Sequence, residues 1–155
     1  MSKVVVLGAG QWGSTLAQVL CDAGNHVLIW GRNQSVVDEI NEKHTNTYYL
    51  ENNALPVGLK ATTDLKEAFD YSNIIILAVP AQTLRENLKI WKPYVQPGAI
   101  FVSSLKGIEL STMSRMTEII QEVMESDNIA IITGPNLANE LILRQPAGAV
   151  AAAPT

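Results

Sequence analysis

Cysteine is almost absent from this chain of 155 residues, because Cys21 is the only one. No disulfide bond can form within the chain, which argues against a disulfide-stabilised secreted domain. We expect Cys21, which lies beside Leu20 in a predicted helix, to pack as a small apolar side chain in the reducing cytoplasm. The two histidines, His26 and His44, belong to no cluster of ligands at metal-binding spacing, and no serine-nucleophile motif is present. The sequence therefore predicts neither a metal site nor a serine hydrolase.

Charged residues make up only 17% of the chain, and acidic residues outnumber basic ones, for a net charge of −4. This balance provides no basic surface for nucleic acid or for an anionic membrane. No apolar run approaches the roughly 18 residues that cross a bilayer, and no signal segment is expected. With 47% hydrophobic residues, the chain is expected to fold as one globular domain without nucleic-acid or membrane partners.

Short apolar runs alternate with helical patterns along the chain, which is the order that βαβ units require. Strands are predicted at residues 4–7, 26–30, 59–61, 74–79, 100–102 and 129–132. The run at residues 74–79 is continuous and largely β-branched, as expected where helices cover both faces of a sheet. The sequence therefore predicts an α/β fold, a Rossmann-like doubly wound and mainly parallel sheet with helices on both faces, with residues 1–155 forming one domain.

Helices between these strands are predicted from apolar residues at helical spacing and from capping residues. Ser35 is expected to cap the second helix, and Asp64 with Glu67 three residues later resembles a capping box. Met113 and Met116 are expected to begin an apolar stripe on the helix before the last predicted strand, where both pack in the core.

The most informative segment joins the first predicted strand to the first helix and reads Gly8-x-Gly10-x-x-Gly13. Gly8 suits a tight turn off the strand, Gly10 lets a phosphate approach the backbone closely, and Gly13 lets the helix pack against the strand. The free N–H groups and partial positive charge of the helix N-terminus favour a bound anion. Because a buried strand precedes the motif and an apolar helix follows it, the motif predicts a dinucleotide pyrophosphate site. A tight turn that binds nothing is the alternative.

Polar segments are expected to gather at one edge of the sheet, because ligands of doubly wound sheets bind outside the carboxyl ends of the strands. Four segments are expected to leave those ends, and a fifth follows the last predicted strand. They are residues 8–13, 31–33, 80–82, 103–107 and 134–136. We expect them to face one crevice, so their polar groups are the candidates for binding and chemistry.

Arg32 and Asn33 follow the second predicted strand, where NAD-specific sites usually carry a carboxylate for the ribose hydroxyls. Arg32 can instead pair with the 2′-phosphate of NADP. A hydrogen bond to a charged group contributes about 1.5–3 kcal/mol, which predicts a preference for NADP over NAD of roughly tenfold to a hundredfold. The alternatives for Arg32 are stacking on adenine and a solvated loop charge.

Three further side chains are candidates for contacts in the crevice. Lys106 is the only charged residue between positions 103 and 107, and it can bind a substrate hydroxyl, carbonyl or phosphate. A lysine on the surface of a loop is the alternative. Asn136 can supply an amide to the crevice, cap the helix that follows it, or do both. Trp12 either stacks over a cofactor or covers the backbone of the glycine segment.

Five segments together resemble the N-terminal domain of bacterial NAD(P)-dependent sn-glycerol-3-phosphate dehydrogenases. They are GAGQWGSTLA at residues 8–17, LIWGRN at 28–33, AVPAQ at 78–82, KGIE at 106–109 and GPNLANE at 134–140. The last two are far more specific than the glycine motif, and the resemblance extends from residue 4 to about residue 150. Residues 46–50, NTYYL, also resemble the family's Asn-x-x-Tyr-Leu loop, although Glu51 stands where proline is common.

The resemblance implies reversible oxidation of sn-glycerol 3-phosphate to dihydroxyacetone phosphate, a step that supplies the backbone of glycerophospholipids. Together with the motif, it implies NAD(P)H as the cofactor, bound by Gly8, Gly10, Gln11, Trp12, Gly13, Arg32, Asn33, Pro80, Lys106 and Ala138. It implies that the phosphorylated small-molecule substrate contacts Lys106, Gly134 and Asn136. Surface that a second domain normally covers would also allow the chain to form a homodimer.

One departure from the family is large. Its proton-transfer lysine belongs to a Gly-Ala-x-Lys-Asn run that opens a helical substrate domain, and residues 1–155 contain no such run. We therefore expect the cofactor-binding half of the enzyme, which binds NAD(P)H, lacks a catalytic residue of its own and turns over substrate negligibly. Two alternatives stay open: a free-standing NAD(P)-binding module without catalysis, and another two-domain dehydrogenase such as a ketopantoate reductase or a 6-phosphogluconate-type enzyme.

Overall fold

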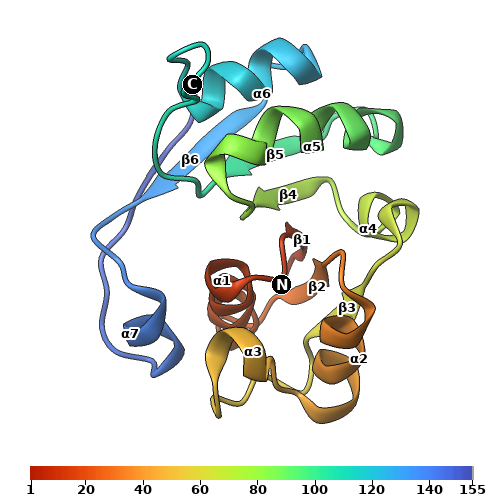
Figure 1. Cartoon of the computed structure of the whole chain (residues 1–155), viewed down its shortest axis with the longest axis vertical. Coiled ribbons are helices and arrows are strands. Elements are labelled where there is room, and N and C mark those ends of the chain that lie inside the picture. The colour runs from red at the N-terminus through yellow and green to blue at the C-terminus, as the bar shows by residue number, and fades with distance from the viewer. Residues whose placement is uncertain (155) are drawn as a thin grey trace.

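A single sheet of seven strands runs through the centre of the molecule, as a computed structural model that describes residues 1–154 shows (Figure 1). The strands are β1 (Lys3–Leu7), β2 (His26–Trp30), β3 (Lys60–Thr62), β4 (Ile74–Leu77), β5 (Ile100–Ser103), β6 (Ile129–Thr133) and β7 (Val150–Ala152). Their order in the sheet is β3-β2-β1-β4-β5-β6-β7. Strands β1 to β6 pair in parallel, whereas β7 pairs antiparallel with β6.

Helices cover both faces of this sheet (Figure 1). They are α1 (Gln11–Asp22), α2 (Gln34–Lys43), α3 (Thr47–Leu50), α4 (Leu65–Tyr71), α5 (Leu84–Trp91), α6 (Met116–Met124) and α7 (Ala138–Ile142), with the 3-10 turns η1 (Ala81–Thr83) and η2 (Lys92–Tyr94). The buried apolar residues of α1, α2 and α7 belong to one core, and those of α4, α5 and α6 belong to the other. The predicted doubly wound α/β fold is confirmed.

Alternate residues of the strands supply these two cores. In β1, Val4 and Val6 face the core under α1 and α2, whereas Val5 and Leu7 face the core under α4, α5 and α6. All four side chains are buried. A parallel strand that is covered on both faces must be apolar throughout, which explains the continuous hydrophobic runs in the sequence.

Two predictions about helix boundaries were wrong. Ser35 lies inside α2, and the N-cap is Asn33, whose Oδ1 accepts hydrogen bonds from the backbone N–H and the hydroxyl of Ser35 at 3.0 and 2.8 Å. Met113 lies before α6 with a φ of +61° and an exposed side chain. Only Met116 begins the buried stripe of that helix, because the chain is still in a left-handed turn at residue 113.

The predicted capping box at the start of α4 forms only in part. Asp64 caps the helix as predicted, since its Oδ1 accepts from the backbone N–H groups of Lys66 and Glu67. The carboxylate of Glu67 does not return to the cap residue, because it accepts a hydrogen bond from the hydroxyl of Thr62. The hydroxyl of Thr62 in turn accepts from the backbone N–H of Asp64. In a complete capping box, the side chain of Glu67 would accept that hydrogen bond.

Two short elements, α3 and β7, were not predicted. α3 has four residues and β7 has three, so neither is long enough to show a hydrophobic period. None of the helices within residues 1–154 combines the length and the apolar character that a membrane crossing demands.

Candidate functional site

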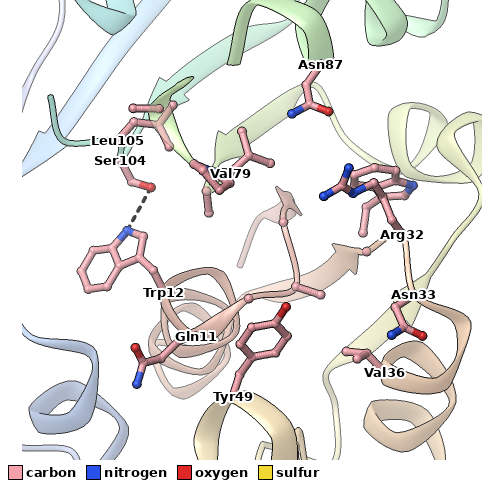
Figure 2. Close-up of a pocket in the computed structure, with 18 of the residues that line it drawn as sticks. Gln11, Trp12, Arg32, Asn33, Val36, Tyr49, Val79, Asn87, Ser104 and Leu105 are labelled. Atoms are coloured by element: carbon pink, nitrogen blue, oxygen red, sulfur yellow. Dashed lines mark hydrogen bonds between the residues drawn. The ribbon is translucent and has the colours of Figure 1, made fainter. Parts of the chain in front are cut away.

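A cavity of about 1040 Å³ lies at the carboxyl ends of β1, β2, β4 and β5 (Figure 2). At this point the strand order reverses, because β1 pairs with β2 on one side and with β4 on the other. Backbone hydrogen bonds continue past the strand ends: Gly8 N donates to Trp30 O and Ala78 N donates to Leu7 O, each at 2.9 Å. The cavity is lined by residues 8–12, 30–34, 78–81 and 104–106, together with Val36, Tyr49 and Asn87.

The glycine loop (residues 8–13) is shaped by two close backbone contacts. Gly8 has a φ of +126°, and a Cβ at this position would lie 2.5 Å from the carbonyl oxygen of Ala78. A Cβ on Gly13 would lie 1.8 Å from the carbonyl oxygen of Gly8. Both positions therefore require glycine, and Gly13 brings α1 directly onto the turn that leaves β1. Gly13 itself does not line the cavity.

Gly10, by contrast, borders open space. No heavy atom lies within 4 Å of the place that a Cβ would occupy, and Gly10 is the N-cap of α1. Within residues 1–154, the backbone N–H groups of residues 10–13 donate to no acceptor. The first turn of α1 also carries no acidic side chain. The loop thus presents unpaired donors and the positive end of a helix to the cavity, an arrangement that binds anions.

Arg32 and Asn33 line the cavity on the side of β2, and Figure 2 shows them across the cavity from Trp12. The side chain of Arg32 is exposed and makes no ion pair among the described residues. The side-chain oxygen Oδ1 of Asn33 is occupied in capping α2. At this end the cavity therefore contains one uncommitted cation and no carboxylate.

Trp12 and Lys106 form the opposite end of the cavity. The indole Nε1 of Trp12 donates to the hydroxyl of Ser104 at 3.1 Å, and that hydroxyl donates to Leu77 O at 2.6 Å. The ring is therefore tied to the end of β4 and to the loop after β5 (Figure 2). The ammonium of Lys106 lies 5.8 Å from the centre of the Trp12 ring and 3.4 Å from Asn136 O. The ammonium of Lys106 is thus held where the cavity meets the segment after β6.

Besides Gly13, three of the predicted site residues do not line this cavity: Gly134, Asn136 and Ala138. They belong to the arm (residues 134–149), which leaves β6, carries α7 to the side of α1 and returns as β7 (Figure 1). Gln11 Nε2 donates to Asn139 Oδ1 at 2.8 Å, which joins the arm to the glycine loop. Asn136 does not cap α7, because the N-cap position is Leu137 and no side chain caps it.

Seven lining residues lie outside the segments predicted to face the crevice: Trp30, Gln34, Val36, Tyr49, Ala78, Val79 and Asn87. Among them are the polar residues Tyr49 on α3 and Asn87 on α5. Tyr49 lies in the NTYYL segment, which carried a family resemblance but no predicted role. Nothing in the sequence around Asn87 pointed to a site. Within residues 1–154, no group of three or more histidine, cysteine, aspartate or glutamate side chains is placed to hold a metal ion.

The Lys106 loop (residues 104–115) is held by charged side chains. Arg85 on α5 donates to both carboxylate oxygens of Glu109 at 2.9 to 3.1 Å, and to both oxygens of Glu122 on α6 at 2.8 and 3.0 Å. Glu109 is buried, and the hydroxyl of Thr112 also donates to it. These bonds from Arg85 and then from Thr112 hold the pKa of Glu109 below its ordinary value. The carboxylate is therefore charged at neutral pH and anchors the loop.

The sequence from residue 3 to residue 155 matches the family model described as the N-terminus of NAD-dependent glycerol-3-phosphate dehydrogenase. The chain is 48% identical over 155 residues to the glycerol-3-phosphate dehydrogenase (NAD(P)+) of Thermobifida fusca, and 46% identical over 154 residues to that of Corynebacterium urealyticum. Each alignment covers 98% of this chain and 46% of the relative. The chain therefore spans about half the length of these curated relatives.

A solved structure agrees with the sequence comparison. The crystal structure of glycerol-3-phosphate dehydrogenase from Coxiella burnetii is similar to this chain with a TM-score of 0.86 at 29% sequence identity. The similarity covers 96% of this chain and 46% of that one. The sheet and its helices thus reproduce one part of a larger protein.

Proposed function

This chain belongs to the family of NAD-dependent glycerol-3-phosphate dehydrogenases, and on that premise we propose that it is the cofactor-binding part of an enzyme that interconverts sn-glycerol 3-phosphate and dihydroxyacetone phosphate. The observation that carries the proposal is the open space at Gly10 beside the unpaired N–H groups of α1. When bound, the cofactor accepts or donates the hydride at its nicotinamide ring.

The cavity fits a nicotinamide dinucleotide in size and in chemistry. Its volume of about 1040 Å³ lies just above the range of roughly 300–1,000 Å³ found for small-molecule sites. The N–H groups of residues 10–12 would hold the pyrophosphate, in the space that a side chain at position 10 would fill. The adenosine half would lie toward Arg32 and Asn33, and the nicotinamide half toward Pro80 and Lys106.

The substrate side of the proposal rests on Lys106 and the arm. The ammonium of Lys106 borders the cavity and contacts Asn136 O at 3.4 Å, so it can reach a ligand from either side. A positive charge there would bind the oxygen that changes between hydroxyl and carbonyl, or the substrate phosphate. We assign Gly134 and Asn136 to the substrate and Ala138 to the cofactor, although all three lie outside the cavity.

We also propose that NADP is preferred over NAD, because Arg32 is exposed, unpaired and on the cavity wall. Calorimetric titration with NADPH and NADH tests this preference. We expect Arg32→Ala to weaken NADPH binding roughly tenfold to a hundredfold and to change NADH binding far less. Lys66→Ala is the control, since Lys66 is an exposed cation that pairs with Asp70 on α4 and lies outside the cavity. Unchanged NADPH affinity in Arg32→Ala would show that the phosphate role is wrong.

The same titration tests the site as a whole. Millimolar NADPH or NADH that gives no binding to the unaltered chain would contradict the proposed site, whatever the effect of Arg32. Binding of both cofactors with unchanged relative affinity in Arg32→Ala would contradict only the preference. The two parts of the proposal therefore fail separately.

Turnover is expected to need more than the residues of this chain. The family's Gly-Ala-x-Lys-Asn run does not occur in residues 1–155, and general acid–base assistance typically contributes ~10²–10⁴-fold. We propose that a helical second domain supplies this lysine in the whole enzyme, which would act in the cytoplasm in glycerophospholipid synthesis. A steady-state assay with dihydroxyacetone phosphate and NADPH should detect negligible turnover by residues 1–155, and ordinary enzyme rates would contradict that.

We also propose that the chain can form a homodimer, which sedimentation analysis would test.

A further inference from the structure

Asn46 lies behind the glycine loop, fully buried and outside the lining of the cavity. It precedes α3, and its backbone oxygen accepts the first hydrogen bonds of that helix from Tyr49 and Leu50. Its side chain makes longer-range contacts. The Nδ2 group donates to the carbonyl oxygen of Ala9 at 3.1 Å and to the hydroxyl of Ser14 at 2.9 Å. Both hydrogens of one carboxamide are therefore used to hold the two sides of the glycine loop.

The orientation of this carboxamide is fixed by the Ala9 carbonyl. A carbonyl oxygen can only accept, so the NH₂ end of Asn46 must face it. In that orientation the Oδ1 of Asn46 is buried without a partner among the described residues. The chain thus keeps an unpaired buried oxygen on Asn46 in order to give Ala9 O a donor.

The contact with Ala9 has a consequence for the next residue. A peptide bond is planar and trans, so its C=O and N–H point in opposite directions. Holding Ala9 O against Asn46 therefore turns the N–H of Gly10 away from Asn46. Gly10 lines the cavity, and its N–H has no acceptor within residues 1–154.

We propose that Asn46 is a positioning residue for cofactor binding: by holding the Ala9 carbonyl, it directs the N–H of Gly10 toward a phosphate oxygen of the dinucleotide. The inference rests on the proposed function, because it needs a pyrophosphate at the glycine loop. If this peptide rotated, the Ala9 carbonyl would face the phosphate, and repulsion between two oxygens would replace a charge-assisted hydrogen bond. Asn46 itself stays behind the loop and does not touch the cofactor.

Substitution by aspartate separates this role from packing. Asn46→Asp keeps the size of the side chain and, when ionised, presents only acceptors to Ala9 O. Titration at pH 8 favours the ionised form. We expect the variant to bind NADPH roughly tenfold to a hundredfold more weakly, the size of one lost hydrogen bond to a charged group. The matched control is Asn41→Asp, since Asn41 Nδ2 also donates to a backbone carbonyl, that of Ala61 at 2.9 Å, away from the cavity. The control should bind NADPH as the unaltered chain does.

The amide resonance of Gly10 provides a readout that a purely structural role would not move. On saturation with NADPH, the Gly10 amide proton of the unaltered chain should shift downfield as its N–H binds the phosphate. The shift should be lost in Asn46→Asp and kept in Arg32→Ala, which weakens binding elsewhere. A folded Asn46→Asp protein with unchanged affinity and an unchanged Gly10 shift would overturn the inference.

Measurements on the unaltered chain distinguish failure of the proposed function from failure of the role of Asn46. If it does not bind NADPH at all, the proposed function fails. If it binds NADPH but its Gly10 amide does not move, only the role of Asn46 fails, and this holds even where Asn46→Asp does not fold.

Discussion

Two loops at the same edge of the sheet are held in place by different forces. The glycine loop contains no charged residue, and contacts between backbone atoms shape it, such as the approach of Gly13 to the carbonyl oxygen of Gly8. The Lys106 loop is held by the carboxylate of Glu109, which Arg85 binds through two nitrogen atoms. The first loop depends on glycine at positions 8 and 13, and the second depends on paired charges.

The difference indicates what each loop can recognise. The glycine loop offers unpaired backbone N–H groups beside Gly10, which in our proposal bind the pyrophosphate that NAD and NADP share. The Lys106 loop presents an ammonium and is anchored three residues later by the carboxylate of Glu109, which Arg85 binds. Substitutions that add one methyl group should therefore disturb the first loop, whereas acid should disturb the second.

The largest effect is expected from Gly13→Ala. A Cβ at this position would lie 1.8 Å from Gly8 O, and neither backbone can move without separating α1 from β1. Overpacking of this kind costs about 3 kcal/mol or more, well above the gain of about 1 kcal/mol in helix propensity. Chemical denaturation would measure the free energy of unfolding. A loss below about 1 kcal/mol would show that close packing does not shape the loop.

Gly10→Ala should separate binding from folding within the same loop. Its φ of −82° and ψ of −171° suit alanine, and the Cβ would enter open space. The free energy of unfolding should change by less than about 1 kcal/mol. NADPH affinity should fall at least about tenfold, because the methyl group occupies the place of the phosphate. Gly58→Ala, which also meets open space but far from the cavity, should leave affinity unchanged.

A smaller effect is expected from acid acting on the Lys106 loop. Arg85 lowers the pKa of Glu109 below 4.5 in the folded chain, so the unfolded chain takes up this proton at the higher pH. The stabilisation is thus complete at neutral pH and is lost as the pH falls below about 4.5. Glu109→Gln should lower the free energy of unfolding at pH 7. It should remove only part of the loss of stability in acid, because Arg85 also lowers the pKa of Glu122. Denaturation midpoints of the unaltered chain and of Glu109→Gln, measured between pH 7 and pH 3, would test the stability and its pH dependence. If the midpoints of the two proteins changed equally with pH, the anchoring role of Glu109 would be contradicted.

The fold could be predicted from the sequence because burial on both faces leaves a clear trace. Strand β4 is apolar along its whole length, and β2 is apolar from Val27 to Trp30. Both can therefore be recognised as buried strands from their own residues alone. The cap of α2 could not be chosen in this way, since both Asn33 and Ser35 are good caps. In the structure Asn33 has the extended backbone of a cap residue, with φ −97° and ψ 113°, and Ser35 already lies within the helix.

The candidate site was predictable where it follows the strand ends and not where it depends on the arm. Residues 8–12, 31–33 and 104–106 line the cavity because parallel strands must end at one edge. The arm instead turns toward α1, where Gln11 binds Asn139, 128 positions later in the sequence. No local pattern encodes a contact of that range. Asn46 escaped notice for the same reason, since its partners Ala9 and Ser14 are more than thirty positions away.

The antiparallel strand β7 also has a protective consequence. It covers the outer edge of β6, pairing residues 131–133 with residues 150–152, so the N–H and C=O groups of β6 on that side are not left open to a strand from another molecule. Its own outer edge is only three residues long and carries small side chains, which makes it a poor template for further strands. This last strand therefore lowers the tendency of the sheet to aggregate.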